Sequence, residues 1–200
     1  LEAGDPRRAM VAAITPFLAE GRAKAWALLD SEKNGLACAR RLSDMMDGII
    51  HALFDASVTV LFQSDNPSTS ERLAVAAVGG YGRGTLAPGS DIDLLFLLPY
   101  KATPWSESIV ETILYALWDL KLKVGHSVRT VDECIREARS DMTIRTALLE
   151  ARYLTGDRQL YAEMEDRYGN EIVTGTAPEF VAAKLTEREQ RVTRAGSSRY

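Results

Sequence analysis

Residues 79–97 read GGYGRGTLAPGSDIDLLFL, and this stretch decides the fold of the chain. Residues 73–78 form a short apolar run, which predicts a buried strand that ends where the glycines begin. Gly79 and Gly80, followed by Gly82 and Gly84, leave backbone N–H groups open to an anion, because no side chain blocks close approach and a positive φ costs little. The stretch therefore predicts a turn that binds phosphate groups.

Two aspartates open the next apolar run. Asp91 and Asp93 stand two residues apart at the start of a predicted strand that reaches Leu98, so their side chains point to one face. Two carboxylates at one spot repel each other unless a divalent cation lies between them. Oxygen ligands beside a phosphate-bearing partner favour Mg²⁺, with Mn²⁺ as a substitute. The pattern predicts a nucleotidyltransferase, in which an attacking hydroxyl displaces pyrophosphate from the α-phosphorus.

Other readings of the stretch fit less well. A P-loop needs lysine after its last glycine, whereas Thr85 follows Gly84. A dinucleotide-binding loop opens a long helix, whereas Pro88 and an Asp-bearing strand follow here. A plain surface turn beside two solvated aspartates is the remaining alternative, and the apolar strand that follows them disfavours it.

Five further side chains near the motif are candidates either for contact with the nucleotide or for structural roles. Ser90 contacts phosphate or stabilises the turn, and Arg83 contacts phosphate or is a solvated surface arginine. Arg129 neutralises a phosphate or pairs with an acid. His126 is expected to be a hydrogen-bonded structural histidine, and Tyr81 is expected to pack against the sheet rather than stack on a base.

The motif resembles the signature of the DNA polymerase β-like nucleotidyltransferase superfamily. Together with VGHSVRT at 124–130 and LLEAR at 148–152, it resembles the bacterial bifunctional uridylyltransferase/uridylyl-removing enzymes over about residues 73–157. The resemblance implies transfer of UMP from UTP to a tyrosine hydroxyl of the PII signal protein, with Mg²⁺ and under glutamine control through domains absent from this chain. It also implies that Gly79 and Gly80 bind the triphosphate, and that Asp91 and Asp93 hold the metal.

One feature of the superfamily is missing from the sequence. Many members place a third carboxylate on a neighbouring strand as general base, but the candidate strand at 123–129 carries no acid. Asp132 and Glu133 come just after it, where Thr130 and Glu133 predict a capping box that opens a helix. The general base stays unassigned. Two alternatives therefore stay open: another nucleotidyltransferase, such as one that transfers AMP, and a nucleotide-binding regulatory module without catalysis.

The expected fold is α+β, with a small mixed β-sheet flanked by helices. Residues 1–70 are expected to form an N-terminal helical segment, since apolar residues between Leu42 and Phe62 recur every three or four positions. Residues 71–135 form the nucleotidyltransferase core, and residues 136–200 a truncated C-terminal helical segment. Helices are expected at 106–122, 131–139, 141–153, 157–168 and from about 179, with a strand at 123–129.

Composition limits the class of protein. A net charge of −4 gives no overall attraction to nucleic acid, so neither nucleic acid nor a membrane is an expected partner. The two cysteines lack metal-binding spacing, which indicates reduced thiols and a cytoplasmic location, and no apolar stretch is long enough to span a bilayer. No His-Asp dipeptide occurs, so no uridylyl-removing activity is expected from this chain.

Overall fold

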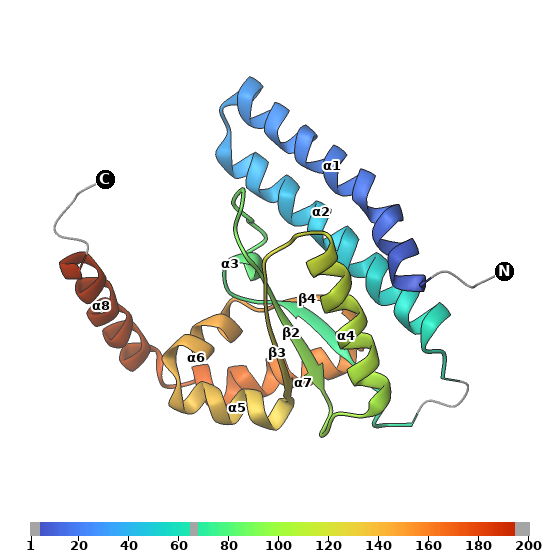
Figure 1. Ribbon diagram of the computed structural model, residues 1–200. Helices are drawn as coiled ribbons and strands as arrows, with labels where there is room; N and C mark the ends of the chain where they lie inside the picture. Colours follow the sequence, from blue (N-terminus) through green and yellow to red (C-terminus); the bar gives the residue numbers. More distant parts are fainter. Residues whose placement is uncertain (1–4, 65–67, 195–200) are drawn as a thin grey trace.

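The computed structural model describes residues 5–64 and 68–194. Its centre is a four-stranded sheet in the order β3-β2-β1-β4 (Figure 1). The strands are β1 (Ala74–Ala77), β2 (Ile92–Leu98), β3 (Val124–Thr130) and β4 (Arg152–Gly156). β2 and β3 are parallel, whereas β1 is antiparallel to both of its neighbours. This arrangement confirms the α+β prediction with a small mixed sheet.

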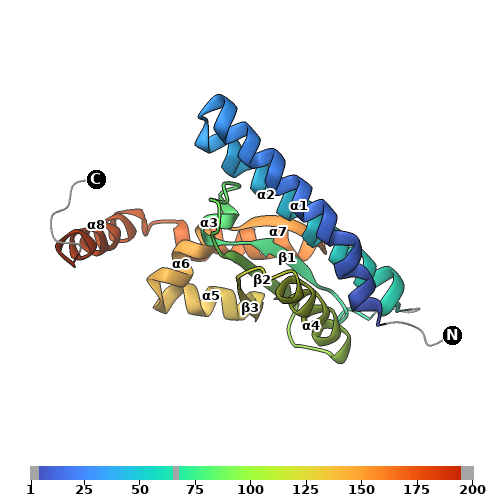
Figure 2. The same ribbon diagram turned by 45° about the horizontal axis from the view of Figure 1, so that its top comes forward.

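Three helices cover one face of the sheet. α1 (Pro6–Glu32) and α2 (Gly35–Ala56) form a long antiparallel hairpin, and α4 (Pro104–Asp119) lies beside it (Figures 1 and 2). The apolar stripe expected before Phe62 forms the buried side of α2, and a π-helical turn (Ser57–Leu61) continues the helix. Asn34 begins α2 by accepting a hydrogen bond from the N–H of Ala37 at 3.0 Å. The stripe packs against alternate residues of β2, which form the larger core with α4.

The other face of the sheet packs against a second layer of helices. These are α5 (Val131–Ser140), α6 (Met142–Leu149) and α7 (Arg158–Tyr168), followed by the π-helical turn η2 (Gly169–Val173). Leu95 and Leu97 of β2 face this layer. α8 (Ala177–Arg194) follows and projects away from the sheet beyond α6 (Figures 1 and 2). One short element completes the order, the single helical turn α3 (Gly79–Gly82) between β1 and β2.

The structure corrects the sequence-based prediction of one helix. The helix expected over 141–153 ends at Leu149, and Arg152–Gly156 instead forms the edge strand β4, paired with β1. Residues 152–156 therefore belong to the sheet and not to a helical segment. The turn predicted at the glycines takes the form of a single helical turn over Gly79–Gly82.

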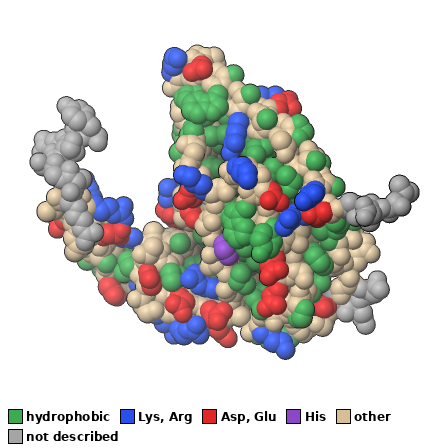
Figure 3. Space-filling model, viewed as in Figure 1, with side chains coloured by type: hydrophobic (Ala, Val, Ile, Leu, Met, Phe, Trp, Pro, Cys, Tyr) green, Lys and Arg blue, Asp and Glu red, His purple; other side chains and the backbone are tan. Residues whose placement is uncertain are grey.

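Several other expectations can be checked directly. Cys38 and Cys134 are both buried and free. In the described residues, no helix has the length and apolar character that crossing a bilayer requires. On the face shown in Figure 3, basic and acidic side chains are interspersed and do not gather into a patch of one sign.

Candidate functional site

The carboxylate of Asp93 lies where three separate segments meet. In the parallel register of β2 and β3, Asp93 is the partner of Gly125. A Cβ atom at Gly125 would lie 2.3 Å from Oδ1 of Asp93, and a Cβ at Gly79 would lie 3.4 Å from Oδ2. Gly79 also has a φ of +56°, a conformation that other residues rarely adopt. Glycine at 125 therefore leaves room for the carboxylate, whereas at 79 it is the backbone conformation that favours glycine.

Asp91 precedes the first residue of β2 and is exposed to solvent. Partial burial, and then the negative charge of Asp91, raise the pKa of the Asp93 carboxyl above its ordinary value. The two acids are thus close enough for their charges to interact, as the Asp-x-Asp spacing predicts. A nearby cation would relieve this repulsion.

The donor chemistry fits a Mg²⁺ ion held jointly by protein and nucleotide. Across residues 5–64 and 68–194 there is no group of three or more His, Cys, Asp or Glu side chains that would form a closed protein site. Mg²⁺ in nucleotide enzymes typically takes one or two carboxylates and completes its shell with water and phosphate oxygens. Asp91 and Asp93 are the residues that would hold it.

The glycine turn is held in place by a polar network that the sequence did not reveal. Arg152 of β4 makes a two-bond ion pair with Asp47 of α2, with Nη1–Oδ2 at 2.6 Å and Nη2–Oδ1 at 3.1 Å. Tyr81, fully buried in α3, donates its hydroxyl to the same Asp47 at 2.6 Å. The Nε of Arg152 donates to the carbonyl of Gly82 at 3.3 Å. We call Asp47, Tyr81 and Arg152 the turn clamp, because together they tie α2 and β4 to α3.

Gly82 adds a steric constraint to the same turn. A Cβ atom there would lie 2.0 Å from the backbone carbonyl oxygen of Glu150. Only glycine allows α3 and the end of α6 to approach this closely. The prediction that Tyr81 packs rather than stacks on a base agrees with its burial.

Arg83 follows the turn and makes an ion pair with Glu150, with Nη1–Oε1 at 2.7 Å. The sequence offered phosphate contact or a solvated surface position for this side chain. The structure shows the half-exposed guanidinium already paired with an acid at the rim of the site. A phosphate would have to compete with Glu150 for it.

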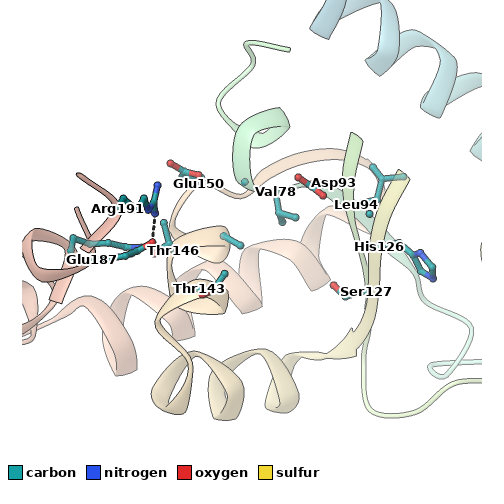
Figure 4. Close-up of a pocket in the computed structure, with 14 residues that line it drawn as sticks. Val78, Asp93, Leu94, His126, Ser127, Thr143, Thr146, Glu150, Glu187 and Arg191 are labelled. Carbon is teal, nitrogen blue, oxygen red and sulfur yellow. Dashed lines mark hydrogen bonds and ion pairs between the residues drawn. The ribbon is translucent and has the colours of Figure 1, made fainter. Parts of the chain in front are cut away.

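A cavity of about 500 Å³ opens beside Asp93 (Figure 4). This volume is in the range of small-ligand sites. Gly79, Asp93 and Gly125 line the cavity on the sheet side, Thr143 and Thr146 line it from α6, and α8 lines the opposite side. The charged residues that line the cavity are Asp93, Glu150, Lys184, Glu187 and Arg191.

Of the predicted site residues, Gly79 and Asp93 line this cavity, whereas Gly80, Arg83, Ser90 and Asp91 do not. Ser90 lines a second hollow of about 340 Å³ together with Trp26 of α1 and Lys121, and its N–H donates to the carbonyl of Ala87 at 3.0 Å. His126 lines the cavity, but its exposed ring packs edge-on against Trp118, with the ring centroids 6.2 Å apart, and points away from Asp93 (Figure 4). The hydrogen-bonded structural role expected for it stays a prediction.

The acids after β3 are used for structure. The N–H of Glu133 donates to Oγ1 of Thr130 at 3.2 Å, and the N–H of Thr130 donates to Oε2 of Glu133 at 2.8 Å, which confirms the predicted capping box. The bond from the Thr130 backbone holds the pKa of Glu133 below its ordinary value. Asp132 pairs with Arg167 at 2.6 Å. Neither acid is placed to act with Asp93.

Comparison with known proteins agrees with this geometry. Residues 62–154 match the nucleotidyltransferase domain family. The chain is 56% identical over 194 residues to the bifunctional uridylyltransferase/uridylyl-removing enzyme of Rhodopseudomonas palustris, and 57% identical over 194 residues to that of a Bradyrhizobium species. In both cases the match covers 97% of this chain and 21% of the relative. The chain therefore spans about a fifth of the length of these relatives, and the resemblance predicted from the sequence is confirmed.

The position of the Asp93 carboxylate can be tested by adding a side chain at Gly125. Gly125→Ala should leave the fold intact, because only the Asp93 carboxylate has to rotate away, and should weaken Mn²⁺ binding by about tenfold or more. Calorimetric titration with Mn²⁺ measures this. Gly35→Ala is the matched control, since a Cβ at Gly35 meets nothing within 4 Å. Equal Mn²⁺ affinity in both variants would contradict the assigned position of Asp93.

The raised pKa of Asp93 predicts a pH-dependent stability. Because the folded protein binds a proton at Asp93 more readily than the unfolded chain does, stability is lost as pH rises above the ordinary Asp value of 3.8. Asp93→Asn should therefore raise the melting temperature of the metal-free protein at pH 7 by a few degrees at most, with less gain in acid. Thermal unfolding across pH tests this. A lower melting temperature in the variant at pH 7 would show that the carboxylate is stabilising instead.

The turn clamp predicts a local loosening. Asp47→Asn removes the charge that Arg152 and Tyr81 share, and should destabilise the fold by about 2 kcal/mol while speeding hydrogen exchange at residues 79–84. Asp55→Asn, an exposed acid further along α2, is the control. Unchanged exchange in the turn would mean that the clamp does not hold it.

Proposed function

We propose that this chain, whose residues 62–154 match the nucleotidyltransferase domain family, transfers UMP from UTP to a tyrosine hydroxyl of the PII signal protein. The observation that supports nucleotidyl transfer best is the position of Asp93, which faces a nucleotide-sized cavity between the glycine turn and Gly125. The choice of UTP rests on the similarity to enzymes named as uridylyltransferases. The choice of PII and of tyrosine rests on the family resemblance alone.

The roles of the residues follow from their places. Asp91 and Asp93 would hold Mg²⁺, which when bound neutralises charge on the triphosphate and on the leaving pyrophosphate. Gly79 and Gly80 allow the backbone to approach the phosphates without steric hindrance. The tyrosine oxygen attacks the α-phosphorus, the bond to the bridging oxygen breaks, and pyrophosphate leaves in line.

Ser90 and Arg83 have smaller proposed roles. Ser90 positions the loop that leads into Asp91, through its N–H bond to Ala87. Arg83 is paired with Glu150, so it contacts phosphate only after this ion pair breaks. Control by glutamine and removal of the uridylyl group are assigned to parts of the protein outside this chain.

Transfer is tested with purified PII protein and UTP labelled at the α-phosphate. Asp91→Asn and Asp93→Asn should each lower the rate of label transfer by about 100-fold or more, with an unchanged circular dichroism spectrum, because each removes a metal ligand and little volume. Asp55→Asn, an exposed acid on α2, is the control. Full activity in either site variant would refute the metal assignment.

Nucleotide choice is tested separately by calorimetry. UTP should bind more tightly than ATP, CTP or GTP, and only when Mg²⁺ is present. Preferred binding of ATP would favour AMP transfer to the protein. Selective UTP binding without any label transfer to PII would favour a regulatory module.

A further inference from the structure

The cavity beside Asp93 has an acidic side and a basic side. The sheet and α6 contribute the carboxylates of Asp93 and Glu150. Among the described residues that line the cavity, the cationic side chains are Lys184 and Arg191, and both come from α8. A helix that lies outside the matched family region thus supplies the positive charge of the cavity.

The start of α8 is anchored to α6 by a buried charge. The guanidinium of Arg145, only 8% exposed, donates to the carbonyl of Ile172 at 2.9 Å and to the hydroxyl of Thr176. It also lies 5.3 Å from the centre of the Phe180 ring, within the range of a cation–π contact. Because these contacts fall just before and within the first turn of α8, they direct the helix past the mouth of the cavity.

Lys184, Glu187 and Arg191 lie on the same face of α8, three and four residues apart. The Nζ of Lys184 lies 2.7 Å from Oε2 of Glu187, and Arg191 pairs with the other carboxylate oxygen. One acid therefore holds two cations, which leaves a net charge of +1 on this face. Figure 4 shows Glu187 and Arg191 on the α8 side of the cavity, beside Thr146 and across from Asp93.

A triphosphate needs such cations. A nucleoside triphosphate carries about four negative charges at neutral pH, and the charge of one Mg²⁺ is already balanced by Asp91 and Asp93. Arg83 is engaged by Glu150 at 2.7 Å. Lys184 and Arg191 have long side chains and suitable N–H donors, and only Glu187 has to be displaced for both to reach phosphate oxygens.

We propose that Lys184 and Arg191 bind the β- and γ-phosphates of the nucleotide, and that Glu187 holds both cations until the triphosphate displaces it. This inference rests on the proposed function, because it assigns phosphate contacts within the same site. It makes α8 the cationic wall of the nucleotide site. It also predicts opposite effects for neighbouring substitutions on one exposed helix.

Calorimetry of the 200-residue chain with UTP, inorganic tripolyphosphate and UMP, each with Mg²⁺, tests the assignment. Lys184→Ala and Arg191→Ala should each weaken binding of UTP and tripolyphosphate by about five- to tenfold, and leave UMP binding unchanged. Glu187→Gln should tighten UTP binding by about threefold, because it releases both cations. Arg188→Ala, an exposed arginine of α8 that does not line the cavity, is the control.

The outcomes separate the two proposals. Unchanged UTP affinity in Lys184→Ala and Arg191→Ala, while Asp91→Asn abolishes Mg²⁺-dependent binding, would overturn the role of α8 and leave the proposed function standing. If Arg188→Ala weakened UTP binding equally, the effect would come from the overall positive charge of α8, and the role of Lys184 and Arg191 would be overturned as well. Failure of the wild-type chain to bind UTP or tripolyphosphate would overturn both.

Discussion

The space around the Asp93 carboxylate is the constraint on which the rest of the site depends. Glycine on β3 opposite Asp93 keeps the carboxylate in place, because a Cβ at Gly125 would lie 2.3 Å from its Oδ1, and glycine in the turn after β1 allows the φ of +56° at Gly79. The parallel register of β2 and β3 brings Gly125 to this position, and the antiparallel pairing of β1 with β2 brings Gly79. The sheet topology therefore creates the opening in which two acids and a cation have room.

The helical hairpin at the N-terminus belongs to the same arrangement. Asp47 on α2 is 105 residues from Arg152 in the sequence, yet the pair joins α2 to the edge strand and, through Tyr81, to the glycine turn. A half-buried ion pair of this kind contributes modest net stability, since desolvation offsets much of the attraction. Its larger effect is geometric, because it restricts the backbone of the glycine turn beside Asp93.

Sequence reasoning succeeded where the signal is local. The Asp-x-Asp spacing, the apolar run of β2, the stripe of α2 and the capping box of Thr130 and Glu133 all depend on neighbours within a few residues, and the structure contains each of them. It failed where the outcome depends on distant contacts. The sequence of β4 continues a helix-like pattern, and the segment forms a strand because it pairs with the open edge of β1. The turn clamp and the need for glycine at 125 likewise depend on how distant strands align in the sheet.

The walls of the cavity come from two parts of the chain, the region that matches the nucleotidyltransferase family and a helix that follows it. The metal-competent acids and the glycine turn lie inside the region that matches the nucleotidyltransferase family, whereas α8 begins at Ala177, beyond the end of that match at residue 154. The cavity therefore combines the carboxylate of Asp93, from the matched region, with the cations Lys184 and Arg191 of the helix that follows it. Function resides in such combinations and not in the fold alone. In this chain the anchor is Arg145, since burying that guanidinium against Ile172 and Thr176 is what brings α8 to the cavity.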